Sequence, residues 1–336
     1  MAVGETPVVL VHLLLNTRAS SVTPDAVEDV RDALAARHEV VLAPTRAPGH
    51  AAELAADARE AGADCVAVLG GDGTMNEAAG ALVGSHCSVA PLPGGSTSVL
   101  SRSLGYPGDP AAAARAVARA LGEGRVERIG VGRAEPDAGP GRHFVCHAGI
   151  GWDAALVAEV ERYRRRLHRA NHALFVAAGL RTFFGGYDRD EPHFTVTFPG
   201  RPHPHSVDGA FSLVLNSDPY TFVGPRPFVV APAADRHRPF AVATVRDMAV
   251  MSFLRTVGGA LRGRGLRPSA SLDTREDVTE VVFTRRTTMP YQLDGDLIGD
   301  VAELRVRHLP DALDVVVPDA SDLSAPARGA PPRARW

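Results

Sequence analysis

The stretch CVAVLGGDGTMNEAAGAL, residues 65–82, passes from an apolar run through three glycines into a helix-forming run. A continuous apolar run is typical of a buried parallel strand, and open α/β sheets bind ligands beyond the carboxyl ends of such strands. Glycines let the backbone approach a ligand, so that amide N–H groups and the positive end of the following helix face phosphate oxygens. We therefore expect a phosphate-binding loop, at Gly70, Gly71, Asp72, Gly73 and Thr74.

The same loop has a simpler interpretation as a tight turn, closed by a capping box in which Thr74 and Glu77 bind the first amides of the helix. Asp72 favours the phosphate-binding interpretation over the simple turn. A carboxylate would repel phosphate at this position, so its presence indicates that a metal ion or a proton binds there as well. All 36 basic residues of the chain are arginines, so the loop lacks the lysine of a Walker motif. Backbone amides and the positive end of the following helix are then the expected sources of positive charge.

The composition sets limits on the class of protein. The chain has 336 residues, 45% of them hydrophobic, which is enough for two cores, and its net charge of -3 gives no reason to expect a nucleic-acid partner. Its three cysteines lack disulfide or zinc spacing, which is typical of a reducing compartment. The apolar run at residues 8–15 is too short for a signal peptide or a membrane span. We expect a soluble, cytoplasmic protein, and a peripheral association with the inner face of the membrane stays open.

Strand-like and helix-like segments alternate over the first 130 residues. Thr23 and Pro24 have the residue types of a helix N-cap and a first helical position. Repeated βα units of this kind predict a parallel sheet covered by helices on both faces. The expected strands are residues 8–15, 39–43, 64–69 and 88–92, and the expected helices are 23–37, 50–61, the segment after the glycine loop, and 110–121.

From residue 131 onward, β-branched runs dominate and predict a second, mainly antiparallel domain. The expected strands are 194–198, 210–215, 240–245, 278–283, 301–306 and 313–317, and the expected helices are 153–184, with a break, and 248–262. The expected domains are residues 1–130 and 131–318, with the last strands free to return to the first domain. Residues 319–336 are rich in Pro, Arg and Ala and are expected to be a disordered tail.

Further stretches around the glycine loop follow one another in the order known from one family. They are NTRAS (16–20), TRAPGHAAELA (45–55), PLPGGSTSVLSRSLGYP (91–107), HAGIGWDAALV (147–157) and YQLDGDLIGD (291–300). Together with GGDGTMNE (70–77), they resemble the diacylglycerol kinase catalytic-domain family, which includes bacterial lipid kinases and sphingosine kinases. The resemblance extends over about residues 8–317.

The resemblance implies an α/β nucleotide-binding domain of the NAD kinase/diacylglycerol kinase type, a β-rich lipid-substrate domain, and a ligand cleft between them. It implies ATP- and Mg²⁺-dependent phosphorylation of a hydroxyl of diacylglycerol or a related lipid at the membrane surface. The implied ATP contacts are Asn16, Thr17, Arg18, Thr45, Gly70, Gly71, Asp72, Gly73, Thr74, Asn76 and Ser96. From the residues alone, ordinary loops explain Asn16, Arg18 and Thr45 at least as well.

Three aspartates, Asp294, Asp296 and Asp300, lie within seven residues in a strand–turn context. Asp-Gly is a common hairpin turn, and such a turn needs no further role. Phosphoryl transfer to an alcohol, however, needs a carboxylate that orients the hydroxyl and accepts its proton. We expect Asp294 and Asp296 to share one face of a strand, one as the base and the other as a ligand of metal or water. The expected catalytic residues are Asp296, Asp294 and Asp72, and the expected Mg²⁺ ligands are Asp72 and Asp294.

The chain departs from the family at three of these positions. Asp296 stands where the family usually has glutamate, Val99 replaces a carboxylate, and Arg238 replaces an aspartate that helps to bind a structural Mg²⁺ in many bacterial members. We expect no structural metal at Arg238, because an arginine cannot ligate a cation.

Three alternatives stay open at the level of sequence. The glycine loop is shared with NAD kinases, and the departures also suit a degenerate nucleotide- or lipid-binding regulator without catalysis. Residues 161–186 combine six arginines with apolar side chains, a pattern that fits either a helix pair packed on the sheet or a helix lying on an anionic membrane. A homodimer is equally open.

Overall fold

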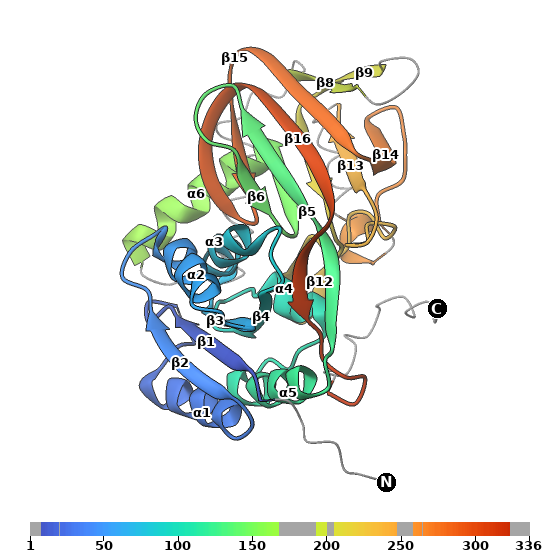
Figure 1. Ribbon diagram of the computed structural model, residues 1–336. Coiled ribbons are helices and arrows are strands. Elements are labelled where there is room, and N and C mark those ends of the chain that lie inside the picture. Colours follow the sequence, from blue (N-terminus) through green and yellow to red (C-terminus); the bar gives the residue numbers. More distant parts are fainter. Residues whose placement is uncertain are drawn as a thin grey trace. The chain divides into compact units, whose positions relative to one another are not determined.

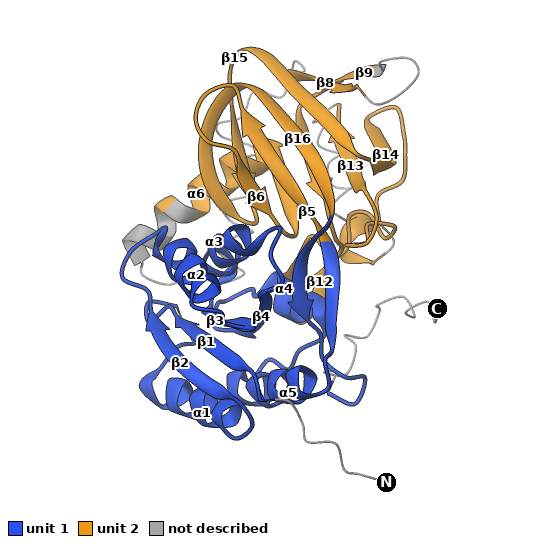
Figure 2. Cartoon of the chain, in the orientation of Figure 1, with its two compact units in different colours: residues 1–129, 311–326 blue, residues 130–310, 327–336 orange. Residues whose placement is uncertain are grey.

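The computed structural model describes residues 8–19, 21–167, 193–199, 205–246, 258–263 and 265–322 (Figure 1). The chain forms two compact units, unit 1 with residues 1–129 and 311–326 and unit 2 with residues 130–310 and 327–336 (Figure 2). Two strands connect them: β5 (Val126–Pro136) leaves unit 1 and β16 (Asp296–Val316) returns to it. Most of the basic stretch at 161–186, most of the expected helix at 248–262, and the tail from residue 323 lie outside the described residues.

Unit 1 is built on a parallel sheet with the strand order β4-β3-β1-β2. The strands are β1 (Leu10–Leu15), β2 (Glu39–Pro44), β3 (Cys65–Gly70) and β4 (Ser88–Pro93). Every residue of β3 is buried, as its continuous apolar sequence predicts for a central strand. The end of β16 pairs in parallel with β4, with Val315 opposite Val89.

Helices cover both faces of this sheet. α1 (Pro24–Ala35) packs against α5 (Pro110–Gly122) on one face, and α2 (His50–Glu60) packs against α3 (Asp72–Leu82) on the other (Figure 1). The Thr23 hydroxyl accepts a hydrogen bond from the Ala26 amide at 3.2 Å, and Pro24 occupies the first turn of α1. The predicted N-cap and the predicted parallel α/β architecture are therefore confirmed.

Unit 2 is mainly antiparallel, with the strand order β14-β13-β10-β7-β15-β16. Its remaining strands are β5 and β6, which pair with each other, β8 and β9 beside β15, and the separate pair β11 and β12. Its core is rich in aromatic side chains, and Phe144, Phe198, Phe240 and Phe283 are each at most 1% exposed. The predicted antiparallel, β-rich character of this region is confirmed.

The elements of unit 2 have the following bounds: β6 (Arg142–Phe144), β7 (His147–Gly151), α6 (Trp152–Leu167), β8 (Phe194–Phe198), β9 (His205–Gly209), β10 (Phe211–Leu215), β11 (Thr221–Val223), β12 (Arg226–Phe228), β13 (Phe240–Val245), β14 (Leu272–Val278) and β15 (Glu280–Leu293).

Two of the expected strand boundaries are wrong. The runs at 301–306 and 313–317 belong to one continuous strand, β16, because the polar segment between them stays extended. The run at 278–283 is divided between β14 and β15. Strand β5 and the short helix α4 (Val99–Leu104) were not expected at all, because neither segment has a long, regular pattern of apolar residues.

Candidate functional site

The glycine loop of unit 1 ends in an uncapped helix. Helix α3 begins at Asp72, its N-cap residue is Gly71, and no side chain makes a capping hydrogen bond there. The hydroxyl of Thr74 accepts instead from Asn16 Nδ2 at 2.8 Å, and Glu77 Oε1 accepts from the Gly49 amide at 2.8 Å. The capping-box interpretation is therefore wrong. The first amides of α3 keep the character of an anion-binding helix end.

A second glycine pair packs directly on this loop. A Cβ atom added to Gly94 would lie 2.7 Å from the Gly70 nitrogen, and one added to Gly95 would lie 2.7 Å from the Gly71 Cα atom. The Gly94 amide also donates to the Gly70 carbonyl at 3.1 Å. Only glycines permit this backbone-to-backbone approach. Gly94 and Gly95 belong to the motif at residues 91–107, but nothing in the sequence indicates this contact with the glycine loop.

Asp72 joins the glycine loop to α4. Its Oδ1 atom accepts a hydrogen bond of 2.6 Å from the Val99 amide at the start of that helix. One turn further along α4 lies Arg102, a half-buried side chain. Burial lowers the pKa of Arg102, and the nearby charge of Asp72 acts in the opposite direction. Sequence reasoning missed this cation, although its spacing of three residues from Val99 places both on one side of a helix.

Two further predicted residues lie at the same carboxyl edge of the sheet. The Asn16 amide donates to the Leu69 carbonyl at 3.0 Å, and Thr45 donates to the Leu15 carbonyl from its amide at 2.8 Å and from its hydroxyl at 3.2 Å. These bonds hold the ends of β1, β2 and β3 together. Asn16, Thr45, Thr74 and the glycines are thereby gathered at one edge.

The other predicted ATP contacts differ in exposure. Thr17, Arg18 and Ser96 are exposed. Asn76 is half-buried on α3, and its buried Oδ1 atom has no hydrogen-bond partner among the described residues. A buried amide oxygen without a partner is costly unless a ligand or water donates to it.

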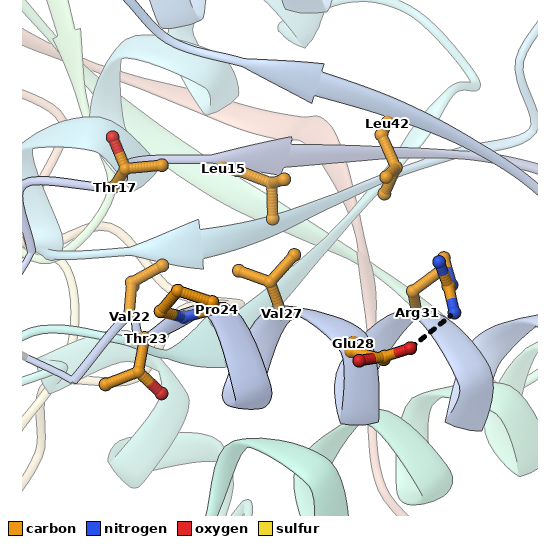
Figure 3. Close-up of a pocket in the computed structure, with 9 residues that line it drawn as sticks. All are labelled: Leu15, Thr17, Val22, Thr23, Pro24, Val27, Glu28, Arg31 and Leu42. Atoms are coloured by element: carbon orange, nitrogen blue, oxygen red, sulfur yellow. Dashed lines mark hydrogen bonds and ion pairs between the residues drawn. The ribbon is translucent and has the colours of Figure 1, made fainter.

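A cavity of about 580 Å³ lies on the α1 face of unit 1 (Figure 3). Apolar side chains from the strands and from α1 point toward one another across it, and Thr17 is the predicted residue that lines it. The arginine that lines it, Arg31, is already paired with Glu28 at 3.5 Å and with Asp32 at 2.8 Å. This apolar groove faces away from α3 and is not the phosphate-binding edge. Its lining residues are Leu15, Thr17, Val22, Thr23, Pro24, Val27, Glu28, Arg31 and Leu42.

In unit 2, the acidic segment forms a tight hairpin. Leu293 pairs with Asp296, which leaves Asp294 and Gly295 as a two-residue turn with φ angles of 48° and 88°. Positive φ at both positions is the signature of a type I′ turn, for which Asp-Gly is a preferred sequence. The expectation that Asp294 and Asp296 share one strand face is wrong, because Asp294 lies in the turn.

The two carboxylates of this hairpin have different environments. Asp294 is 7% exposed and accepts hydrogen bonds from the amides of Val145, Cys146 and His147 at 2.7, 2.8 and 2.8 Å. Asp296 is half-buried at the first position of β16. Asp294 therefore anchors the turn to the segment before β7, whereas Asp296 lies where a substrate can more readily reach it.

A buried polar cluster adjoins this turn. It consists of His147 on β7, Asp153 on α6, Gln292 on β15, and Tyr220, which directly precedes β11. Burial lowers the pKa of His147 to about 4 and raises the pKa of Asp153, while hydrogen bonds from Tyr220 and Gln292 act in the opposite direction on Asp153. The motifs quoted from the sequence contained three of these residues, yet no sequence signal distinguished them from core positions.

Arg238 forms a paired contact with Asp277, with distances of 3.1 Å from Nε and 2.7 Å from Nη2 to its two carboxylate oxygens. Within the described ranges, no group of three or more His, Cys, Asp or Glu side chains is arranged to hold a metal ion. Mg²⁺ in phosphoryl-transfer sites is commonly held by only one or two carboxylates together with substrate phosphates. Asp72 has the carboxylate that such a site needs, and the Val99 amide holds this side chain beside the glycine loop.

Residues 11–134 match the family model described as the diacylglycerol kinase catalytic domain. The resemblance to the diacylglycerol kinase catalytic domain is thus confirmed. The matched region contains the uncapped glycine loop, the Gly94–Gly95 pair, and Arg102.

Solved structures show how far the diacylglycerol kinase fold extends along the chain. The crystal structure of a diacylglycerol kinase from Bacillus anthracis str. Sterne has a TM-score of 0.67 at 15% identity, covering 94% of this chain and 98% of that one. Another from the same organism, described as a candidate diacylglycerol kinase, has a TM-score of 0.72 at 18% identity, covering 93% and 98%. At these identities the comparison establishes the fold alone. The matched part of the chain includes residues of both units.

An NAD kinase from Archaeoglobus fulgidus, solved with ATP, matches with a TM-score of only 0.49 at 11% identity, covering 92% of this chain and 94% of that one. No curated protein matches the sequence. None of the helices within the described residues combines the length and the hydropathy needed to cross a bilayer.

Proposed function

We propose that the protein is an ATP-dependent lipid kinase that phosphorylates a hydroxyl of diacylglycerol or a related lipid. The observation that carries this proposal is the family match over residues 11–134, which contain the glycine loop with its uncapped helix end. In this proposal ATP and Mg²⁺, when bound, supply the phosphoryl group and balance the charge of the phosphates. The remaining chemistry falls to side chains and amides of the chain.

Unit 1 holds the nucleotide in this proposal. The amides at the start of α3 donate to phosphate oxygens, and the Asn76 carboxamide and the Asn16–Thr45 edge contact the rest of the nucleotide. Asp72 is the proposed Mg²⁺ ligand. Arg102 takes the place of the lysine that the chain lacks, because it is a half-buried cation next to Asp72.

Unit 2 supplies the acceptor side in this proposal. Asp296 orients the lipid hydroxyl and accepts its proton as the bond to phosphorus forms, since a general base must lie within hydrogen-bond reach of that proton. Asp294 is the weaker candidate for base or metal ligand, because three backbone amides already bind its carboxylate. We assign it the role of fixing the turn that carries Asp296.

The proposal is tested by ATP turnover with diacylglycerol, sphingosine and NAD as separate acceptors. We expect turnover with a lipid, and a loss of at least about 100-fold in kcat for Asp296→Ala, because general-base catalysis typically contributes 10²–10⁴-fold. We expect Asp72→Ala to abolish most of the activity and to weaken the dependence on Mg²⁺. Asp300→Ala is the matched control, since Asp300 is an exposed aspartate on the same strand.

Three outcomes contradict the proposal. Turnover with NAD and with neither lipid indicates an NAD kinase. ATP binding by calorimetry without transfer to any acceptor indicates a regulator without catalysis. Full lipid turnover by both variants shows that the assigned carboxylates are wrong.

A further inference from the structure

The turn at residues 294–295, which precedes Asp296, has a left-handed backbone at both positions. Asp294 has a φ of 48° and Gly295 a φ of 88°, and Asp-Gly is a preferred sequence for this conformation. Two side chains hold the turn in place. Asp294 binds the three amides of residues 145–147, and Gln292 Oε1 accepts from the Gly295 amide at 2.8 Å.

The orientation of the Gln292 amide is itself fixed. Gln292 is fully buried, its Nε2 atom donates to Asp153 Oδ2 at 2.8 Å, and the same atom lies 3.2 Å from His147 Nδ1. A flipped amide would set its oxygen against the Asp153 carboxylate and its NH₂ group against the Gly295 N–H. Asp153 therefore determines which end of Gln292 faces the turn.

Asp153 is in turn held by Tyr220, whose hydroxyl donates to Asp153 Oδ1 at 2.6 Å. Strand β7 provides the space in which Asp153 and Gln292 meet, because Gly149 lies opposite Gln292 in the sheet. A Cβ atom added to Gly149 would lie 1.8 Å from Asp153 Oδ2 and 2.6 Å from Gln292 Nε2. Any residue other than glycine at this position would separate the two side chains.

We propose that Gln292 is a positioning residue, which is oriented by Asp153 and Tyr220 and sets the turn so that Asp296 is presented to the acceptor hydroxyl. This inference rests on the proposed function for the role of Asp296, whereas the support of the turn by Gln292 is independent of it. The chain of contacts runs from Tyr220 through Asp153 and Gln292 to the Gly295 amide.

The test uses the full-length protein and two readouts, lipid kinase kinetics and amide hydrogen exchange at Gly295. Gln292→Met removes both amide hydrogen bonds at similar volume. We expect kcat to fall at least ten-fold, the KM for ATP to stay within two-fold, and exchange at Gly295 to accelerate at least ten-fold. Thr195→Val is the control, because it removes a side-chain hydrogen bond to Asp208 in the same unit, away from the turn.

A charge exchange separates positioning from general stabilisation. Gln292→Glu alone places two carboxylates side by side, and we expect it to lose activity as Gln292→Met does. Adding Asp153→Asn restores one donor and one acceptor at this contact, while the carboxylate introduced at position 292 keeps an oxygen for the Gly295 amide. We expect the double variant to recover both kcat and slow exchange to within about three-fold of wild type.

The outcomes distinguish this inference from the proposed function. A wild type that phosphorylates no lipid overturns the proposed function, and exchange at Gly295 then decides alone whether Gln292 holds the turn. The inference is wrong if Gln292→Met leaves exchange at Gly295 unchanged, or if it accelerates exchange equally throughout unit 2. It is also wrong if the double variant recovers neither readout.

Discussion

Asp72 has one carboxylate oxygen 2.6 Å from the Val99 nitrogen, so part of its role is to join two backbone segments. Asp294 does the same in unit 2, where it accepts from three amides. In both cases a carboxylate that the sequence predicts to be catalytic or metal-binding also accepts hydrogen bonds from buried backbone donors. Such donors are costly to leave unpaired. Residue type and motif position therefore do not separate catalytic carboxylates from structural ones. Burial and hydrogen-bond partners do.

Arg102 is the residue whose substitution tests the charge balance of the glycine loop. We expect Arg102→Gln to weaken ATP binding about ten-fold, which corresponds to about 1.4 kcal/mol, because a partly buried charge-assisted contact to phosphate is lost. Arg102→Lys should weaken it less, since the charge is retained. Calorimetric titration with ATP measures both affinities.

The matched control for this experiment is Arg115→Gln. Arg115 is an exposed arginine on α5 in the same unit, 4.0 Å from Asp109. Equal ATP affinity in wild type and Arg102→Gln would show that the phosphates do not contact Arg102. A similar loss in Arg115→Gln would indicate a nonspecific effect of net charge.

At the scale of elements, the β15–β16 hairpin is the part of the molecule whose chemistry depends most on its geometry. Its two-residue turn places Asp294 outside the ladder and Asp296 as the first residue of β16. We expect Asp294→Asn to lower the free energy of unfolding by about 2–4 kcal/mol. The new NH₂ group would face the Val145 amide, leaving a buried donor unpaired, and charge-assisted bonds to two other amides would weaken.

Urea unfolding of Asp294→Asn and Asp300→Asn measures this effect. Asp300 is exposed on the same strand, so its substitution should change stability by less than about 0.5 kcal/mol. Equal stability of the two variants would mean that the three bonds to Asp294 contribute little. The left-handed conformation does not confound the comparison, because Asn tolerates it as well as Asp.

The elements with strong local signals were predictable from the sequence, and those defined by long-range contacts were not. Strand β3 and helices α1 and α5 follow from a continuous apolar run, from Thr23 and Pro24, and from an alanine-rich period. Strand β16 is interrupted in sequence by polar residues, and only its pairing with β15 and β4 keeps it extended. Local pattern carries no information about such pairing.

The candidate site divides in the same way. The glycine loop was predicted from its position after a strand, whereas Asn16 and Thr45 were expected from the family resemblance. Asn16, Thr45 and Thr74 do lie together at that edge. The roles of Arg102 and Gln292 were missed, because neither side chain belongs to a sequence motif that assigns it a partner. Their neighbours Asp72 and Asp153 are 30 and 139 positions away in sequence, which only the folded chain reveals.

At the scale of the whole molecule, two groups of unit 2, the buried His147 and the half-buried Asp218, give stability opposing dependences on pH. Burial lowers the pKa of His147 to about 4, so between pH 4 and 6.5 the unfolded state binds more protons and stability rises with pH. Burial raises the pKa of Asp218 from 3.8 to about 6, so between these values the native state binds more protons and stability falls as pH rises. The two contributions partly cancel between pH 4 and 6.

Removing one contribution should expose the other. Asp218 Oδ1 alone accepts from the amides of Val230 and Ala231, at 2.8 and 3.0 Å, so Asp218→Asn keeps both bonds while removing the titrating proton. We expect the free energy of unfolding of Asp218→Asn, relative to wild type, to increase by about 1–2 kcal/mol between pH 4 and pH 6.5, after allowance for partial solvent screening. Urea unfolding at half-unit pH intervals measures the difference. A difference that stays constant or shrinks over this range would show that the Asp218 carboxyl titrates at an ordinary pKa, and that its two backbone bonds outweigh its burial.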